Sequence, residues 1–192
     1  MSWANQPGPD DRPKGWWAKT VVAGLIGGAA MMLFLMAAYA AMGLGAWFPP
    51  NGIATVLPNF RPIPGELPPP DFVAAQSLTG LLIHALMSGL LGVVFGAIAE
   101  GFLADHARSV PRMAVAGFVY ATFVWMFFGF GGVYLAGLQP VFGTATFFFG
   151  HLVFGVVTGI SLALMTTKRD MLTVTFAPEE KPAAATTTAR RR

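Results

Sequence analysis

HALMSGLLGVVFG, residues 84–96, begins with an ionisable side chain and continues with a small residue at every fourth position. The small residues after His84 are Ser88, Gly92 and Gly96. A spacing of four places side chains on one face of an α-helix. In lipid, faces of small residues let two helix backbones approach closely and favour helix association. The stretch therefore predicts a helix that packs through its small residues against a neighbouring helix.

HLVFGVVTGISLA, residues 151–163, repeats this arrangement. The residues at the same spacing after His151 are Gly155, Gly159 and Ala163. The segments upstream also match: Ala23-Gly24 with Gly28 corresponds to Ala116-Gly117 with Ala121. Gly24 and Gly28 form a similar small-residue face for helix packing. We therefore predict two tandem helical hairpins of the same orientation, related by an axis along the membrane normal.

The composition places these helices in a membrane. Of the 192 residues, 55% are hydrophobic and only 11% are charged, whereas about 25% of the residues of an average soluble domain are charged. Asp, Glu, Lys and Arg are absent from three windows, 20–60, 72–99 and 113–167. One crossing takes about 20 apolar residues, so the first two windows hold one span each and the third holds two.

The expected fold is an all-α integral membrane four-helix bundle formed by residues 18–167. A cluster of glycines and a proline between Gly129 and Pro140 divides the third window. The spans are expected near 20–45, 73–100, 113–136 and 141–166. Residues 1–17 are expected to be a flexible N-terminal segment, and residues 168–192 a disordered basic tail.

The positive charges predict the orientation. Eleven of the twelve Lys and Arg residues lie near the termini or between the second and third spans, and the exception is Arg61. By the positive-inside rule both termini face the cytoplasm. Residues 48–71 then form an external loop. Its many prolines predict an extended, stiff segment. Either its apolar side chains lie on the membrane face or on a partner, or the segment is a spacer.

His84 and His151 are expected near the middle of their spans, at matched depth. Ionisable residues inside a membrane usually face the bundle interior and have a function. Three interpretations stay open. The histidines are neutral and hydrogen-bond each other, a backbone carbonyl or a nearby hydroxyl; or they are axial ligands of a b-type haem; or they form a proton-relay or quinone-binding pair. A bare metal site is disfavoured, because two ligands without a nearby carboxylate rarely hold a metal, and the chain has no Cys.

Three stretches carry a resemblance to a known family: PPNGIATVLP, LLIHALMSGLLGVVFGAI and FFFGHLVFGVVTGISLAL. They resemble an uncharacterised family of small prokaryotic four-helix membrane proteins, over residues 18–166. Such members have a proline-containing segment after the first helix and a histidine before small residues in the second and fourth. The positions that fit are His84, Gly92, Gly150, His151, Gly155 and Gly159. The resemblance implies a fold and, with the predicted orientation, a place in the inner membrane of a prokaryote; it implies no reaction.

The function predicted from these features is that of a non-catalytic accessory subunit in a larger membrane complex, of the respiratory or photosynthetic electron-transfer class. The sparse polar chemistry, the small-residue faces, the proline-rich loop and the aromatic run of residues 118–130 favour this interpretation. The alternative is a membrane electron carrier that binds haem b or quinone through His84 and His151. A third is a small transporter or channel. Nucleic acid is not an expected partner, because three terminal arginines form a very small basic patch.

Overall fold

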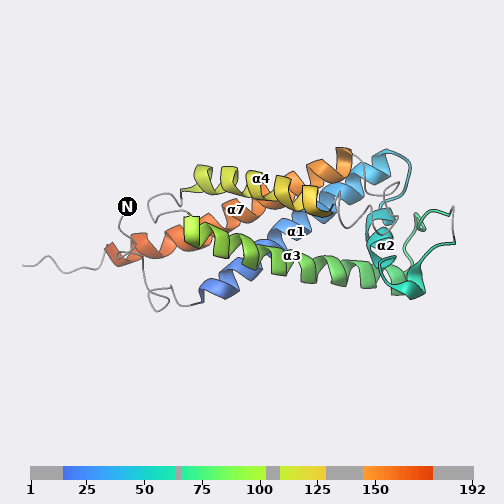
Figure 1. Cartoon of the computed structure of the whole chain (residues 1–192), viewed down its shortest axis with the longest axis horizontal. Coiled ribbons are helices and arrows are strands. Elements are labelled where there is room, and N and C mark those ends of the chain that lie inside the picture. Colours follow the sequence, from blue (N-terminus) through green and yellow to red (C-terminus); the bar gives the residue numbers. More distant parts are fainter. Residues whose placement is uncertain (1–14, 64–65, 103–108, 129–144, 175–192) are drawn as a thin grey trace, which may run out of the picture.

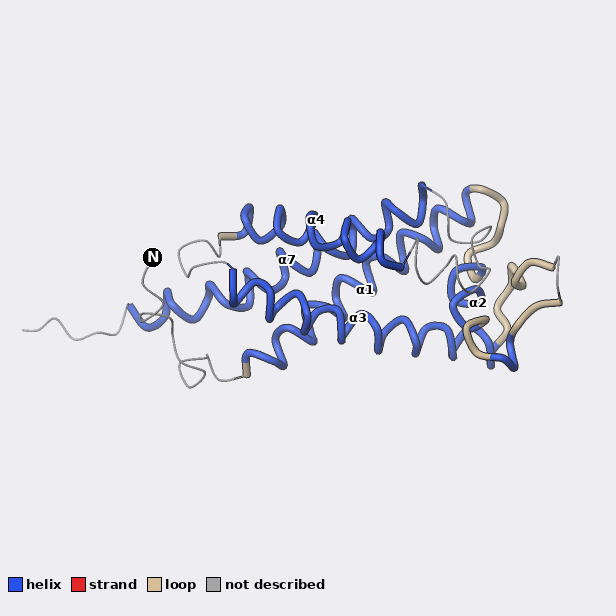
Figure 2. The backbone as a smooth tube through the Cα atoms, in the orientation of Figure 1, coloured by secondary structure: helices blue, strands red, loops and turns tan. Residues whose placement is uncertain are grey.

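The computed structural model describes residues 15–63, 66–102, 109–128 and 145–174, with only the backbone of 101–102 and 167–174. Within these ranges the chain is helical and has no strand (Figures 1 and 2), as predicted. The elements are α1 (Trp16–Ala41), α2 (Phe48–Ala54), the short 3-10 helix η3 (Pro58–Phe60), α3 (Ala74–Phe102), α4 (Val110–Met126) and α7 (Ala145–Val174).

Three helical segments in the described part of the chain are long and apolar enough to cross a membrane: Trp16–Ala41, Ala74–Glu100 and Ala145–Thr166. They support the prediction of a membrane protein. α4 is apolar but has only 17 residues. The two spans predicted in the third window, 113–136 and 141–166, stay predictions where they adjoin each other in the sequence, because 129–136 and 141–144 lie outside the described residues.

Glycines set the ends of α1, which differ from the predicted 20–45. Gly15 precedes the helix with a φ of 76°, while Gly43 and Gly45, with φ of 77° and 86°, follow it. Such left-handed conformations stop a helix and favour glycine. At the other end of the chain, α7 continues to Val174, past the predicted limit of 167, because no Gly or Pro interrupts the sequence between Gly159 and Val174.

The expectation of an extended loop over 48–71 is wrong for its first part. α2 occupies Phe48–Ala54 and has prolines in its first turn, where the missing N–H would have no helical partner. Pro49 and Pro50 are buried, and α2 lies across one end of the bundle, against α3 and the end of α1 (Figure 1). We call the described residues from Trp47 to Val73 the cap.

Asn51 holds the cap on α3. Its side-chain Nδ2 donates hydrogen bonds to the carbonyls of Pro69 and Asp71, both at 2.8 Å. Its Oδ1 accepts a hydrogen bond from Ser77 Oγ at 2.6 Å, and its backbone carbonyl accepts one from Gln76 Nε2 at 3.1 Å. Asn51 is fully buried, so these bonds satisfy polar groups that water cannot reach.

The long helices pack in the order α3, α1, α7, α4. α1 contacts both α3 and α7, α4 contacts α7, and α3 and α4 scarcely touch. The buried side chains that fill the centre include Leu35, Phe95 and Phe154. We call α1 with α3 the first pair and α4 with α7 the second pair.

Candidate functional site

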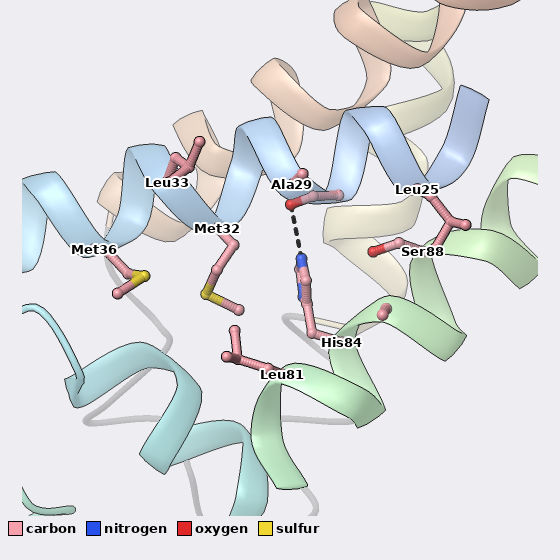
Figure 3. Close-up of a pocket in the computed structure, with 10 residues that line it drawn as sticks. Leu25, Ala29, Met32, Leu33, Met36, Leu81, His84 and Ser88 are labelled. Carbon is pink, nitrogen blue, oxygen red and sulfur yellow. Dashed lines mark hydrogen bonds between the residues drawn. The ribbon is translucent and has the colours of Figure 1, made fainter. Parts of the chain in front are cut away.

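The candidate site is a cavity of about 330 Å³ between α1 and α3 (Figure 3). His84 is in its wall, on α3, and Ser88 follows one turn later. The opposite wall is apolar and carries Met32 and Met36 of α1. Leu33, also in the lining, is 68% exposed, so the cavity reaches the outer surface of the bundle.

His84 connects the two walls. Its Nε2 lies 2.9 Å from the carbonyl oxygen of Gly28 on α1, and Figure 3 shows this bond crossing between the helices. A carbonyl can only accept, so Nε2 carries the hydrogen and donates it. In the neutral ring Nδ1 is then an acceptor. His84 is therefore both a tie between α1 and α3 and a hydrogen-bond acceptor in the cavity wall.

His151, in the equivalent place on α7, bonds differently. Its Nδ1 donates to the backbone carbonyl of Phe147 in its own helix, at 2.9 Å. The rings of His151 and Phe147 also meet edge to face, with centroids 4.5 Å apart. His151 is 6% exposed, whereas His84 is only partly buried. Of the predicted alternatives, hydrogen bonding to backbone carbonyls is the one that the structure shows for both rings.

The small residues of the first pair lie at the closest approach of α1 and α3. A Cβ on Gly24 would meet the carbonyl of Ser88 and the Cα of Gly92, and one on Gly92 would meet the carbonyl of Thr20. A Cβ on Gly28 would collide with the side chain of Ser88. Gly96 faces the side chain of Thr20 in the same way. Because backbone atoms cannot move aside, glycine is required at positions 24 and 92, where the facing atoms belong to the backbone.

The small residues of the second pair make the same contacts. A Cβ on Gly117 of α4 would meet the carbonyl of Gly155, and one on Gly155 would meet the Cβ of Ala121. Gly159 lies against the carbonyl of Met113, and Ala163 is fully buried. Every predicted packing residue therefore lies in a close helix contact or in the core.

Sequence reasoning missed three contacts that shape the bundle. Gly27, next to the predicted Gly28, faces the opposite way and lies against Phe154 and Thr158 of α7. Tyr120 of α4 donates a hydrogen bond to the carbonyl of Leu91 on α3, at 2.9 Å. The third is Asn51 of the cap, which lies within the quoted stretch PPNGIATVLP but was given no role. The adjacent glycines of α1 were the one signal available for Gly27.

Comparison with protein-family models, with curated proteins and with solved structures gives no match to this chain. The family resemblance described above therefore adds nothing to the functional argument, which depends on the contacts of the chain itself. Within the described residues no group of three or more His, Asp or Glu side chains is placed to hold a metal ion.

Proposed function

We propose that this chain is a non-catalytic accessory subunit of a larger membrane complex, with the cap as its docking element. The observation that carries the proposal is the exposure of large apolar side chains on the cap. Ile63 is 66% exposed and Leu67 is 59% exposed, and other exposed members are Val56, Leu57 and Phe72. These residues lie beyond the ends of α1 and α3, outside the apolar spans. Exposed apolar residues gathered in one such segment favour contact with another protein or with the membrane surface.

The rigidity of the cap supports a docking role. Asn51 anchors the cap to α3, and the rings of Trp47 and Phe72 join its two ends, with centroids 4.7 Å apart. Thr55 adds a bond from its Oγ1 to the carbonyl of Gly52, at 2.6 Å. A surface that is ordered before binding loses less conformational entropy when a partner binds.

The polar side chains of the spans support a structural rather than a catalytic role. His84, His151 and Tyr120 each donate a hydrogen bond to a backbone carbonyl. Two of these bonds, those of His84 and Tyr120, join different helices. In a membrane such bonds mainly stabilise helix association.

The finer architecture that we propose is a four-helix bundle of two tandem hairpins, with both termini cytoplasmic. The contacts of the two pairs support the duplication, since they match residue by residue. The contact of Gly24 with Ser88 corresponds to that of Gly117 with Gly155. The contact of Gly92 with Thr20 corresponds to that of Gly159 with Met113. Between the pairs, the contact of Gly27 with Thr158 corresponds in position to that of Tyr120 with Leu91. The distribution of Lys and Arg supports the orientation.

A haem between His84 and His151 has less support. In the described structure α1 packs against both α3 and α7, while those two helices are not packed against each other. His84 bonds to α1 and His151 bonds to its own helix. Each ring is therefore already hydrogen-bonded to a backbone carbonyl.

The test is extraction of the tagged chain from its native membranes in a mild detergent, followed by identification of the chains that stay bound in stoichiometric amount. We expect a larger membrane complex, and electron-transfer complexes are the class to examine first. The variant Ile63→Glu places a charge on the proposed docking surface and should lose the complex. Asn59→Glu, on an exposed residue of the same cap, is the matched control and should retain it.

Two results would overturn the proposal. One is wild-type protein that is extracted alone under conditions that preserve other complexes of the same membrane. The other is an Ile63→Glu variant that keeps its partner. The thermal stability of both variants in detergent should equal that of the wild type, which separates loss of docking from loss of folding.

A further inference from the structure

The cavity of the first pair has a counterpart position in the second pair. When His84 is aligned with His151 and Gly24 with Gly117, Leu81 falls on Phe148 and Met32 on Trp125. Leu81 and Met32 line the cavity. Trp125 and Phe148 instead contact each other edge to face, with ring centroids 4.9 Å apart. The second pair therefore fills with two aromatic rings the position that the first pair leaves open.

The comparison of the two pairs indicates the shape of a ligand that would fit the cavity. The helix backbones of the two pairs approach through equivalent glycines, Gly92 and Gly159 among them. The space beside the backbone contact is therefore similar in both pairs, and in the second pair flat rings occupy it. Smaller or flexible side chains in the first pair leave about 330 Å³ empty. A flat ring fits this space, and the thioether sulfurs of Met32 and Met36 make favourable contacts with aromatic rings.

The hydrogen bonding of His84 indicates the chemistry of the occupant. Nε2 donates to the Gly28 carbonyl, so the neutral ring offers the cavity an acceptor at Nδ1 and no donor. A ligand that satisfies this nitrogen must itself donate a hydrogen bond. The remaining lining is apolar apart from Ser88, and the exposure of Leu33 at the rim leaves a path for an apolar tail toward lipid.

We propose that the cavity between α1 and α3 binds a lipid-soluble molecule whose flat ring bears a hydroxyl group, a quinol or phenol head with an apolar tail. The hydroxyl donates to His84 Nδ1, and the ring lies against Met32 and Leu81. The proposal concerns binding alone and does not depend on the subunit role proposed above. A subunit that binds no partner would still bind this ligand.

The oxidised and reduced forms of one compound test the proposal. Decylubiquinol donates hydrogen bonds from its hydroxyl groups, whereas decylubiquinone has only acceptors. Binding of each form to the full chain in lipid nanodiscs is measured by titration calorimetry, with empty nanodiscs as the blank. We expect the quinol to bind at least about tenfold more tightly than the quinone, the ratio that corresponds to about 1.4 kcal/mol.

Three variants locate the binding site. The double variant Met32→Trp with Leu81→Phe copies the residues of the second pair and should abolish quinol binding by filling the cavity. Leu86→Phe, on the same helix but 66% exposed and outside the lining, is the matched control and should bind as the wild type does. His84→Phe removes the acceptor and should reduce the ratio between quinol and quinone to near one.

Equal binding of quinol and quinone by the wild type would overturn the proposal, as would quinol binding that the double variant does not change. Binding no greater than in empty nanodiscs would show partitioning into lipid only and would overturn it too. If the double variant does not fold, the change of ratio in His84→Phe decides the matter, and an unchanged ratio contradicts the proposal.

Discussion

In the first pair, Gly24 of α1 lies against the carbonyl of Ser88; in the second pair, Gly117 of α4 lies against the carbonyl of Gly155. The backbone contacts of the two pairs thus correspond, but their side chains differ in size at a few places. Leu81 in the first pair corresponds to Phe148 in the second; Leu81 lines the cavity described above, whereas Phe148 packs against Trp125. At this aligned position, small or flexible side chains border a cavity in the first pair, and aromatic rings pack together in the second pair.

The contacts between the two pairs also depend on the size of the side chains. Gly27 lets α1 pack directly against Phe154 and Thr158 of α7. At the corresponding position of α4 stands Tyr120, which reaches Leu91 and the ring of Phe95, and α3 and α4 scarcely touch. Gly27 thus allows close contact between α1 and α7, whereas the larger Tyr120 lies between α4 and α3, which stay further apart.

The largest expected effect concerns the cap, because Asn51→Leu removes its anchor on α3. The change leaves the buried Ser77 hydroxyl without its acceptor and the half-buried Pro69 carbonyl without its donor, and an unsatisfied buried group costs about 1–3 kcal/mol. We expect the free energy of unfolding in detergent to fall by about 3 kcal/mol or more. Asn59→Leu, on an exposed cap residue, should cause little change. A loss of the same size in both variants would show that Asn51 is not the anchor.

The next largest effect tests whether the two pairs are equivalent. Gly92→Ala and Gly159→Ala each place a methyl group against backbone atoms of the facing helix. Overpacking of this kind costs about 1–3 kcal/mol, and we expect similar losses of unfolding free energy in both variants. In Gly89→Ala the new Cβ would meet only side chains, at 3.6 Å or more, so this control should be nearly neutral. A large loss in one pair alone would break the equivalence.

A smaller effect follows from an exchange of sizes between the pairs. Gly28 faces Ser88 in the first pair, whereas Ala121 faces Gly155 in the second. Gly28→Ala alone should destabilise the protein, and adding Ser88→Gly should restore most of the loss, because the first pair then has the sizes of the second. Neighbouring sites couple by about 0.5–3 kcal/mol, and a double-mutant cycle of unfolding measures this coupling. Simple additivity of the two changes would contradict the correspondence.

The smallest effect distinguishes the two histidines. His84→Phe removes a hydrogen bond between helices, which in membrane proteins contributes about 0.6 kcal/mol on average and at most about 1.7 kcal/mol. His151→Phe removes a bond within one helix, to the carbonyl of Phe147, and should change the unfolding free energy less. The same denaturation series measures both variants. A greater loss for His151→Phe would mean that its burial, and not its bond, sets its contribution.

The spans could be predicted from the sequence because charge-free windows and the length of a crossing leave few alternatives. The close contacts at Gly24 and Gly92 were also within reach, since a spacing of four defines a helix face. The cap was not, because Asn51 finds its partners 18 to 26 residues further along the chain. Proline content suggested an extended segment, whereas the burial of Pro49 and Pro50 against α3 allows a helix.

The candidate site was only half predictable. Its histidine was found because an ionisable group stands out among apolar residues. The cavity was not, because its volume depends on Met32 and Leu81, which come from two helices. Which carbonyl each histidine contacts also depends on side-chain rotation, and His84 and His151 differ in this although their sequence contexts match.

The position of Asn51 has a consequence for the order of events at the ribosome. Its hydrogen-bonding partners Pro69, Asp71, Gln76 and Ser77 are all synthesised later than Asn51 itself. α1 can therefore enter the lipid while α2 still has no place to attach. Asn51 can form its hydrogen bonds to Gln76 and Ser77, and so fix α2 against α3, only when the first turn of α3 has been synthesised. The cap can therefore attach to the bundle only after the second apolar helix, α3, has begun to emerge.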